Sequence, residues 1–237
     1  MTKDNGKKIK VTKDGPYLIS GNIPLDKAQI IGDDEGIPIK WEFGEKYPGL
    51  ANYALCRCGL SKNKPFCDDA HIQAGFDGTE TASRQPCLEQ AETTYGPDLD
   101  LTDAEPLCAI ARFCRRAGDT WTLTEHSDDQ KSKEIAIQEA CDCPSGRLIA
   151  WEKQSGKPYE PKFEPSISVV EDTDQKVSGP LWAKGGIAVE AVDGFQYEVR
   201  NRVTLCRCGR SGNKPFCDGT HVKSKFNDGD SSINRQT

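Results

Sequence analysis

The sequence predicts an α+β protein in which two similar β units pair with each other inside one chain, with a small α+β insert between them. Three observations lead to this prediction. Residues 55–76 and 205–226 are nearly the same sequence, alternating apolar residues precede both copies, and residues 86–165 share neither feature. Two like units in one chain commonly pair about a pseudo-two-fold axis, as two subunits do in a dimer. We therefore expect an intramolecular pseudo-dimer with segments at 1–85, 86–165 and 166–237.

The composition limits the functions to consider. The chain has 237 residues and a net charge of −6, and 35% of the residues are hydrophobic, so the core is modest. An acidic chain is not typical of a nucleic-acid binder, and no run of about 18 apolar residues is present to cross a membrane. No apolar stretch follows the basic N-terminus, so we expect no secretory signal and a cytosolic location. In that reducing compartment the 11 cysteines are better explained by metal binding than by disulfides.

The repeat is dense in residues that bind metals. Residues 55–76 read LCRCGLSKNKPFCDDAHIQAGF and residues 205–226 read LCRCGRSGNKPFCDGTHVKSKF, so every cysteine, the histidine and the Asn-Lys-Pro-Phe run recur. A weaker echo, GPYLISGNIPL at 15–25 and GPLWAKGGIAV at 179–189, has a larger offset. The first copy therefore carries extra residues between its two echoes.

A β-hairpin is expected to deliver each of these metal-binding loops. In the second copy Ile187 and Val189 alternate with polar or small residues, and Asp193-Gly194 is typical of a type I′ turn. The residues that follow keep a period-two pattern up to the first cysteine, and a similar alternation precedes the first copy. These residues are Tyr197, Val199, Val203 and Leu205 in the second copy, and Ile37, Ile39, Trp41 and Phe43 in the first.

Each copy has the spacing C-x-C-x8-C-x3-H, which offers three thiolates and one imidazole. Such a set can hold zinc or an iron–sulfur cluster. Zinc sites usually use C-x2–4-C, whereas the tighter C-x-C suits two thiolates on one iron, with the third cysteine and the histidine on a second iron. The spacing therefore favours two [2Fe-2S] clusters over zinc. The predicted ligands are Cys56, Cys58, Cys67 and His71 in the first copy, and Cys206, Cys208, Cys217 and His221 in the second.

Both copies resemble the CDGSH iron–sulfur domain family, also called NEET proteins, whose signature is C-x-C-x2-[S/T]-x3-P-x-C-D-G-x-H. The first copy departs from the signature at Asp69, where the family has glycine. Aspartate is among the residue types that tolerate a positive φ, so we expect the ligand set to be kept despite this change. Beyond the ligands, the matching residues are Ser61, Pro65 and Asp68 in the first copy, and Ser211, Pro215, Asp218 and Gly219 in the second.

The resemblance implies two CDGSH-type units packed side by side, sharing strands in a small β-sandwich cap with the clusters below it. Family members with one motif form homodimers, so two motifs in one chain imply the same assembly built internally, in a monomer. A histidine ligand raises the reduction potential relative to four thiolates. It also competes with a proton near its free pKa of about 6.5, which predicts proton-sensitive, transferable clusters.

The stretch between the copies predicts a mixed segment. A capping-box pattern at 102–105 precedes apolar residues at helical spacing. Residues 121–123 look like a short strand, and a second, polar helix is expected to begin near Asp128. After Asn227 the chain is rich in Asp, Ser and Asn, so the tail is expected to be disordered.

Three cysteines of this segment form a third candidate centre. Cys108 and Cys114 are followed far downstream by Cys143, which precedes a proline. This resembles the bacterial ferredoxin pattern with Ala111 in place of its middle cysteine. The segment is thus similar to the divergent single-cluster ferredoxin domain that accompanies some CDGSH motifs, and the resemblance implies a small ferredoxin-like insert.

Alternatives remain open for this third centre. Three thiolates suit a [3Fe-4S] cluster, whereas Cys141 could complete a four-ligand site for [4Fe-4S] or zinc. Cysteines that are only buried, or that are oxidised to disulfides, are the remaining alternative. Cys87 has no assigned role.

These features predict an iron–sulfur protein for electron transfer, cluster transfer or both, with an unidentified redox or cluster-acceptor protein as its partner. Several centres in one small chain favour electron transfer, and histidine ligation favours cluster transfer or sensing. The sequence displays no nucleophile motif, phosphate-binding glycine loop or nucleotide fingerprint, so we expect no catalysis of its own, no nucleic-acid partner and no membrane attachment. A zinc-stabilised interaction module is the alternative, which a colourless, zinc-containing protein would indicate.

Overall fold

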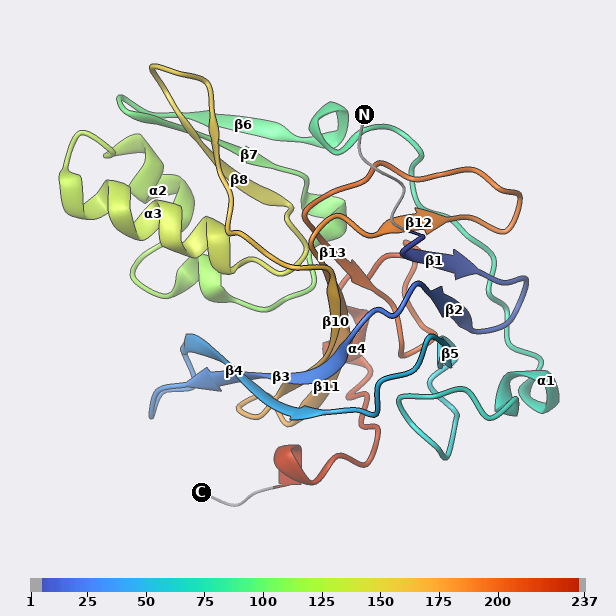
Figure 1. The fold of residues 1–237 in the computed structure, drawn as a ribbon. Helices are drawn as coiled ribbons and strands as arrows, with labels where there is room; N and C mark the ends of the chain where they lie inside the picture. Colours follow the sequence, from blue (N-terminus) through green and yellow to red (C-terminus); the bar gives the residue numbers. More distant parts are fainter. Residues whose placement is uncertain (1–5, 235–237) are drawn as a thin grey trace.

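The computed structural model describes residues 6–234, which form three β-sheets and a few short helices. Two of the sheets belong to the repeated units, and the third, with two helices packed on it, belongs to the segment between them (Figure 1). The predicted mixed α+β class, with two β units and an α+β insert, is confirmed. Among residues 6–234, no helix is both long and apolar enough to cross a bilayer.

The first sheet comes mainly from the N-terminal copy, in the order β12-β1-β2-β5. That copy supplies β1 (Lys8–Val11), β2 (Tyr17–Ser20) and β5 (Asn52–Leu55). The C-terminal copy supplies β12 (Ala188–Glu190), which runs parallel to β1.

The second sheet has the same plan with the copies exchanged, in the order β13-β11-β10-β3-β4. In this sheet β3 of the N-terminal copy runs parallel to β10 of the C-terminal copy, just as β12 does beside β1. The N-terminal copy therefore lends β3 and β4 to the sheet of the C-terminal copy, which lends β12 in return, and the two units are interleaved. The strands are β3 (Leu25–Gly32), β4 (Pro38–Lys46), β10 (Ser166–Asp172), β11 (Val177–Lys184) and β13 (Arg202–Leu205).

The register of the strands explains both sequence echoes. Tyr17 on β2 pairs with Leu55, and Leu181 on β11 pairs with Leu205, in each case at the residue before the first metal-binding cysteine. The larger offset of the upstream echo arises from β3 and β4, which form a long antiparallel hairpin in the first copy. At the corresponding place the second copy has no further strand, only the connection 191–201 between β12 and β13.

The two copies share one hydrophobic core, because the inward-facing residues of both sheets pack together. Tyr17 is fully buried there, and its hydroxyl lies 2.8 Å from the carbonyl oxygen of Cys206 and 2.9 Å from that of Pro215. The core of the first copy thus supports the metal loop of the second. Other members of this cluster are Ile9, Val11, Ile19, Leu55, Ile167, Val169, Leu181, Val189, Val203 and Leu205.

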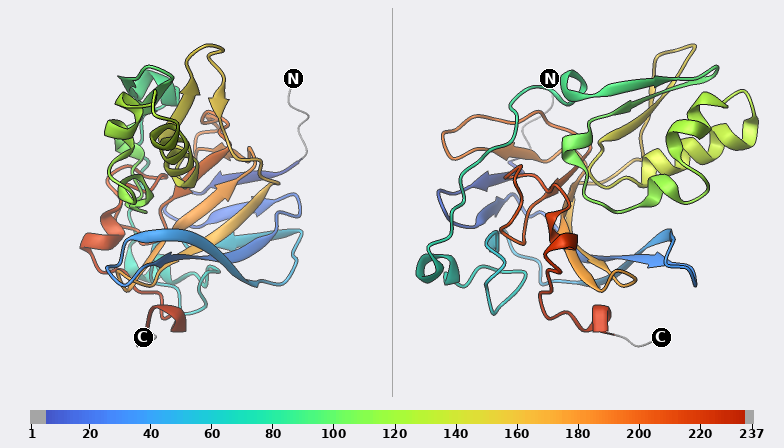
Figure 2. Two further views of the ribbon diagram at one scale, coloured as in Figure 1. Left: turned by 90° about the vertical axis from the view of Figure 1, so that its left-hand side faces the viewer. Right: turned by 180° about the vertical axis from the view of Figure 1, so that it is seen from behind.

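The insert is a four-stranded antiparallel sheet, β6-β7-β8-β9, with α2 and α3 on one side of it (Figure 2). Asp129 accepts a hydrogen bond from the N–H of Ser132 at 2.8 Å and so caps α3. The polar helix predicted near Asp128 is therefore confirmed. The elements are β6 (Glu92–Tyr95), β7 (Leu99–Asp103), α2 (Thr120–Glu125), α3 (Gln130–Asp142), β8 (Leu148–Glu152) and β9 (Pro158–Tyr159).

Two local predictions for the insert are wrong. The capping-box residue Thr102 lies inside β7, where it pairs with Ile149, and residues 105–107 make only one 3-10 turn before an irregular loop. Residues 121–123 belong to α2 and not to a strand. The carboxylate of Asp119 accepts from the N–H of Thr122 at 2.9 Å, and this cap outweighs the β preference of the residues that follow.

The period-two patterns and the tail also need correction. Val199 is 41% exposed and lies in a loop, so the strand leading into the second site is only β13. Phe43 is 51% exposed, because β4 is the edge strand of its sheet. Residues 228–234 are not disordered: Asp230 forms an ion pair with Lys27, and Ile233 is 1% exposed. Residues 235–237 lie outside the described part of the chain.

Candidate metal centres

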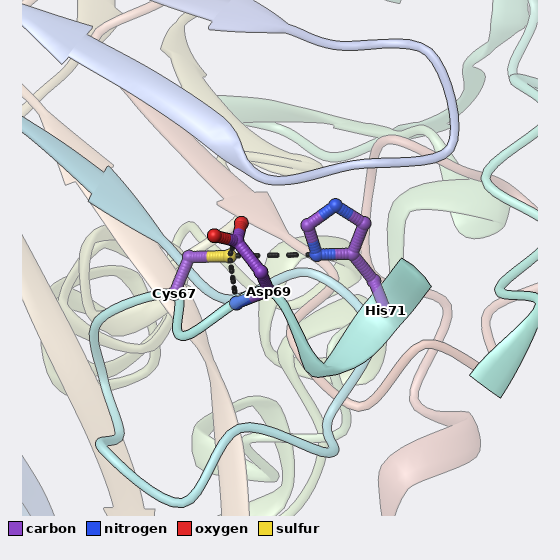
Figure 3. Close-up of side chains that lie close together, drawn as sticks. All are labelled: Cys67, Asp69 and His71. Carbon is purple, nitrogen blue, oxygen red and sulfur yellow. Dashed lines mark hydrogen bonds between the residues drawn. The ribbon is translucent and has the colours of Figure 1, made fainter. Parts of the chain in front are cut away.

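The first candidate site begins where β5 ends. The next turn places Sγ of Cys56 at 3.7 Å from Sγ of Cys58. The chain then loops back to α1 (Ala70–Ala74), in which Nδ1 of His71 lies 3.5 Å from Sγ of Cys67 (Figure 3). Burial raises the pKa of Cys67, and the nearby charges of Asp69 and Cys56 raise it further. The four predicted ligands of the first copy therefore lie together.

The second site repeats this arrangement after β13. The two sulfurs of Cys206 and Cys208 are 3.7 Å apart, and Nδ1 of His221 lies 3.4 Å from Sγ of Cys217. The histidine again lies in a short helix, α4 (Thr220–Lys223). Two independent stretches of chain thus present the same four donor atoms in the same way.

Side chains of the signature hold each loop in shape. The Ser61 hydroxyl donates to the carbonyl oxygen of Phe66 at 2.7 Å, and the carboxylate of Asp68 accepts from the N–H of Lys62 at 2.7 Å. These bonds fix the loop between the second and third cysteines. The same bonds recur in the second copy, from Ser211 to Phe216 at 2.7 Å and from Gly212 to Asp218 at 2.8 Å.

Backbone amides point at the sulfurs. In the first copy the N–H of Asp69 lies 3.4 Å from Sγ of Cys67, and in the second the N–H of Gly219 lies 3.4 Å from Sγ of Cys217. Donors placed in this way stabilise a thiolate, which is the form that binds metal.

A buried arginine stands between the first two cysteines of each site, and the sequence reasoning overlooked both. Arg57 is 1% exposed and donates to the carbonyl oxygens of Thr12, Gly15 and Gly78, each at 2.8 Å. It ties the metal loop to the turn between β1 and β2. The signal was available, because the residue within C-x-C is arginine in both copies.

The arginine of the second site has a different environment. Arg207 donates to the carbonyl oxygen of Gly179 at 2.7 Å, and it also pairs with the carboxylates of Glu171 and Asp228. Burial raises the pKa of Glu171 to about 7, and the nearby charge of Asp228 adds to this rise against the lowering effect of the Arg207 charge. Carboxylates therefore compensate the charge of Arg207, whereas within residues 6–234 Arg57 forms no ion pair.

The two sites also differ in exposure. Cys67 and His71 are half-buried, whereas Cys217 is 3% and His221 is 4% exposed. Burial, helped by the Arg207 charge, lowers the pKa of His221 to about 4, so its ring is neutral at pH 7 and can act as a metal ligand.

The turn before each histidine shows why one copy keeps glycine and the other does not. Asp69 has φ of 66° and Gly219 has φ of 79°, so both adopt the left-handed conformation, and the first copy tolerates aspartate there as expected. Asp69 is exposed. A Cβ on Gly219, by contrast, would lie 2.4 Å from the side chain of Ile110 and 3.3 Å from the carbonyl oxygen of Cys108. The second copy needs glycine because the insert packs against it.

The third candidate site lies in the insert. Cys108, Cys114 and Cys143 line one small cavity together with Arg147. Although burial lowers the pKa of Arg147, the negative charges of the cysteines and of Asp103 raise it overall. The structure therefore brings together the three cysteines predicted from the ferredoxin-like spacing, around a buried guanidinium.

The loop that carries two of these cysteines has an unusual backbone. Ile110 has φ of 52° and Arg112 has φ of 67°. A β-branched residue with positive φ is a clear outlier, and such strain persists only where the surrounding structure holds it, often at a functional site. Burial raises the pKa of the Cys108 thiol. The backbone N–H of Ile110 donates a hydrogen bond to the sulfur of Cys108, which partly opposes this rise.

The other two cysteines are not brought to this site. Sγ of Cys141 lies 3.6 Å from the carbonyl oxygen of Tyr159, and Cys141 does not line the cavity of the three cysteines. Sγ of Cys87 lies 3.7 Å from a guanidinium nitrogen of Arg200. Ala111, at the position of the missing ferredoxin cysteine, is 9% exposed and packs in the hydrophobic core.

Asp69 is a further possible donor at the first site, which the sequence indicated only as a turn residue. Its carboxylate lies 3.8 Å from Sγ of Cys67, and one donor atom each of Cys67, Asp69 and His71 lie within 4.8 Å of one another (Figure 3). An acidic residue at the glycine position of the signature was the available signal. Asp69 places a negative charge beside the first site that the second site lacks.

Comparisons with known proteins agree with this geometry. The model of the family described as iron-binding zinc finger of the CDGSH type matches residues 14–72 and 178–222. The model described as divergent 4Fe-4S mono-cluster matches residues 94–153. Searches of curated proteins and of solved structures found no match. The donor sets fit such groups chemically, since each site offers thiols backed by amide donors or a buried cation.

Proposed function

The chain carries two CDGSH-type iron-binding domains on either side of a divergent 4Fe-4S mono-cluster domain, and from this membership we propose that it is a one-electron carrier with three iron–sulfur centres. Each CDGSH domain would hold a [2Fe-2S] cluster by three cysteines and one histidine. Cys108, Cys114 and Cys143 would hold the third centre. Iron–sulfur clusters supply reversible uptake of one electron at potentials set by ligands, hydrogen bonds and exposure.

The observation that carries this proposal is the twofold occurrence of one donor set. In both copies two sulfurs lie 3.7 Å apart and a third sulfur lies 3.4–3.5 Å from an Nδ1, so the two close pairs recur with matching distances. In each copy a backbone N–H faces the sulfur of the third cysteine, and a buried arginine stands between the first two cysteines. Positive charge and N–H donors near a cluster stabilise its reduced, more negative state.

The insert supports a third centre without a fourth cysteine. Cys141 and Cys87 point elsewhere, and Ala111 occupies the position of the missing ligand. Three thiolates are the ligand set of a [3Fe-4S] cluster, so this cluster type is the one that the chain's own residues favour, although the matching family is described as 4Fe-4S.

Cluster transfer is a second candidate function, and one observation favours it. Cys67 and His71 are half-buried, Cys67 in the loop before α1 and His71 on that short helix, so an acceptor protein can reach them. The equivalent pair at the second site is almost fully buried. We propose that any transferred cluster leaves from the first site.

One experiment tests both functions. The purified chain is mixed with an apo-ferredoxin, and cluster loss is followed by visible circular dichroism for wild type, His71→Cys and His221→Cys. We expect transfer to slow in His71→Cys, because a fourth thiolate replaces a ligand that a proton can displace. His221→Cys should transfer like wild type. Equal, measurable rates in all three would overturn the first site as the source of the cluster. No transfer in any of them would leave electron transfer, which a reversible one-electron titration of each centre would support.

A further inference from the structure

We infer that the second CDGSH site is the inner member of an ordered relay, with the insert's site on one side of it and the first CDGSH site on the other. Electrons would enter or leave only at the two outer sites. The inference rests on the proposed function as an electron carrier. It adds the order of the three centres and identifies the two outer sites that exchange electrons with partner proteins.

The insert touches the second site directly. Pro106 accepts a hydrogen bond from the side-chain amide of Asn213 at 2.9 Å, and the carbonyl of Cys108 lies against Gly219. The side chain of Ile110 fills the space beside the same glycine. The loop that bears a ligand of the insert therefore packs on the turn that bears Cys217 and His221, with no intervening element.

The second site in turn touches the first. A Cβ on Gly59 would lie 2.7 Å from the carbonyl oxygen of Cys208, and a Cβ on Gly209 would lie 2.5 Å from that of Cys58. Both glycines have positive φ, and only glycine permits this approach of two backbones. The segment that follows α1 also crosses over, since the N–H of Thr81 donates to the carbonyl of Lys214 at 2.8 Å.

The insert and the first site lie on opposite sides of this pair. Figure 1 shows α4, with the second site, between α1 and the helices of the insert, and Figure 2 shows the same order from behind. The insert contacts the N-terminal copy at β4, where Arg116 donates to the carbonyl of Ile39 at 3.1 Å. That hairpin points away from α1. The order is therefore insert, second site, first site.

The exposure of the ligands identifies the two sites at which electrons can enter or leave. Cys67 and His71 of the first site are half-buried, and Cys108 and Cys114 line a surface cleft of 580 Å³. The ligands of the second site are 1% to 6% exposed, so no partner can reach them closely. Arg115 also lines the cleft and gives a donor or acceptor protein with an acidic surface a place to dock, whereas Arg112 is paired with Asp172.

The transfer is balanced by two external partners. One electron passes from a one-electron donor protein to one outer site, through the second site to the other outer site, and then to a one-electron acceptor protein. The donor is oxidised by one electron and the acceptor is reduced by one. No covalent bond of the chain forms or breaks.

The order can be tested by electron paramagnetic resonance (EPR) on the cluster-loaded chain. Two matched variants each empty one CDGSH site: Cys206→Ser/Cys208→Ser at the second, and Cys56→Ser/Cys58→Ser at the first. Magnetic coupling between reduced centres falls with the cube of their separation. We expect the signal of the insert's centre to lose its coupling in Cys206→Ser/Cys208→Ser and to keep it in Cys56→Ser/Cys58→Ser. The reverse result, or equal loss in both, overturns the proposed order.

A second measurement avoids variants that could fail to fold. A soluble dysprosium chelate is added to the wild-type chain, and the relaxation of each reduced centre is measured. The first site and the insert's centre should be strongly enhanced and the second site only weakly. Enhancement of the second site as strong as that of the first overturns the relay. Absence of iron and sulfide from the purified chain would instead contradict the proposed function itself.

Discussion

The side chain of Ile110 occupies the space that a side chain on Gly219 would need, with only 2.4 Å between it and a Cβ built on that glycine. This contact joins the insert to the second CDGSH loop. It also accounts for the one departure between the two signatures, because the equivalent Asp69 is exposed and free to carry a side chain. The difference between the repeats at this one signature position thus marks which copy the insert covers.

Substitution of that glycine should damage two centres at once. We expect Gly219→Asp to force Ile110 away and to lower the free energy of unfolding by about 1–3 kcal/mol, as overpacking does. Iron should be lost from the second site and the insert together, which iron analysis and EPR of the separate signals would show. Asp69→Gly is the matched control and should keep all its iron. Full iron content in Gly219→Asp would contradict the contact.

The charge of Asp69 should tune the first site alone. Removing a carboxylate 3.8 Å from Sγ of Cys67 favours the reduced cluster, so Asp69→Gly should raise the midpoint potential of the first site. An effect of about 1 kcal/mol corresponds to about 40 mV for one electron. Redox titration followed by EPR measures this, and Glu42→Gln on the exposed β4 should change nothing. A lower potential in Asp69→Gly would refute the assignment.

Glu171 should make stability depend on pH. Burial raises its pKa from 4.5 to about 7, so the folded chain holds a proton that the unfolded chain releases. Its contribution is complete below about pH 4.5 and is lost as the pH rises through about 7, a change of about 3 kcal/mol. In Glu171→Gln the thermal midpoint should fall less than in wild type between pH 5 and pH 8. Parallel curves for wild type and variant would show that Glu171 is ionised throughout, held by Arg207.

The cysteines of the insert should divide into two groups. Alanine at Cys108, Cys114 or Cys143 should remove the iron of the third centre, on the order of three atoms per chain, while both CDGSH centres stay. Alanine at Cys141 or Cys87 should leave the iron content unchanged, because these thiols lie at Tyr159 and Arg200. Iron loss in Cys141→Ala would show that a four-cysteine site forms.

The repeat and the ligand spacing predict most of the metal chemistry, because ligands so close in sequence meet through local turns alone. Cys56 and Cys58, or Cys67 and His71, need only a loop and one helical turn to come together. The alternation of Ile187 and Val189 is likewise local, and both residues are buried. The predicted hairpin does not deliver the second loop, because β12 pairs with β1 and β13 pairs with β11.

Features set by distant contacts escape the sequence. The exchange of β3 and β12 between the two sheets depends on parallel pairing across more than a hundred residues of chain, which no local pattern encodes. The capping box at 102–105 fails because Thr102 pairs with Ile149 in β7, so the sheet overrides a local helix signal. The requirement for glycine at position 219 comes from the side chain of Ile110, which lies far away in the sequence. The covering of the second site by the insert depends on the same distant contact.

The most direct test of the account is the amount of iron and acid-labile sulfide per chain in anaerobically purified protein, measured together with zinc. Three loaded centres predict a reddish-brown protein with about seven or eight iron atoms, of which about four belong to the two CDGSH sites. About four iron atoms would leave the insert empty and remove the relay. A colourless protein with zinc and no sulfide would contradict the central claim that this chain is an iron–sulfur carrier.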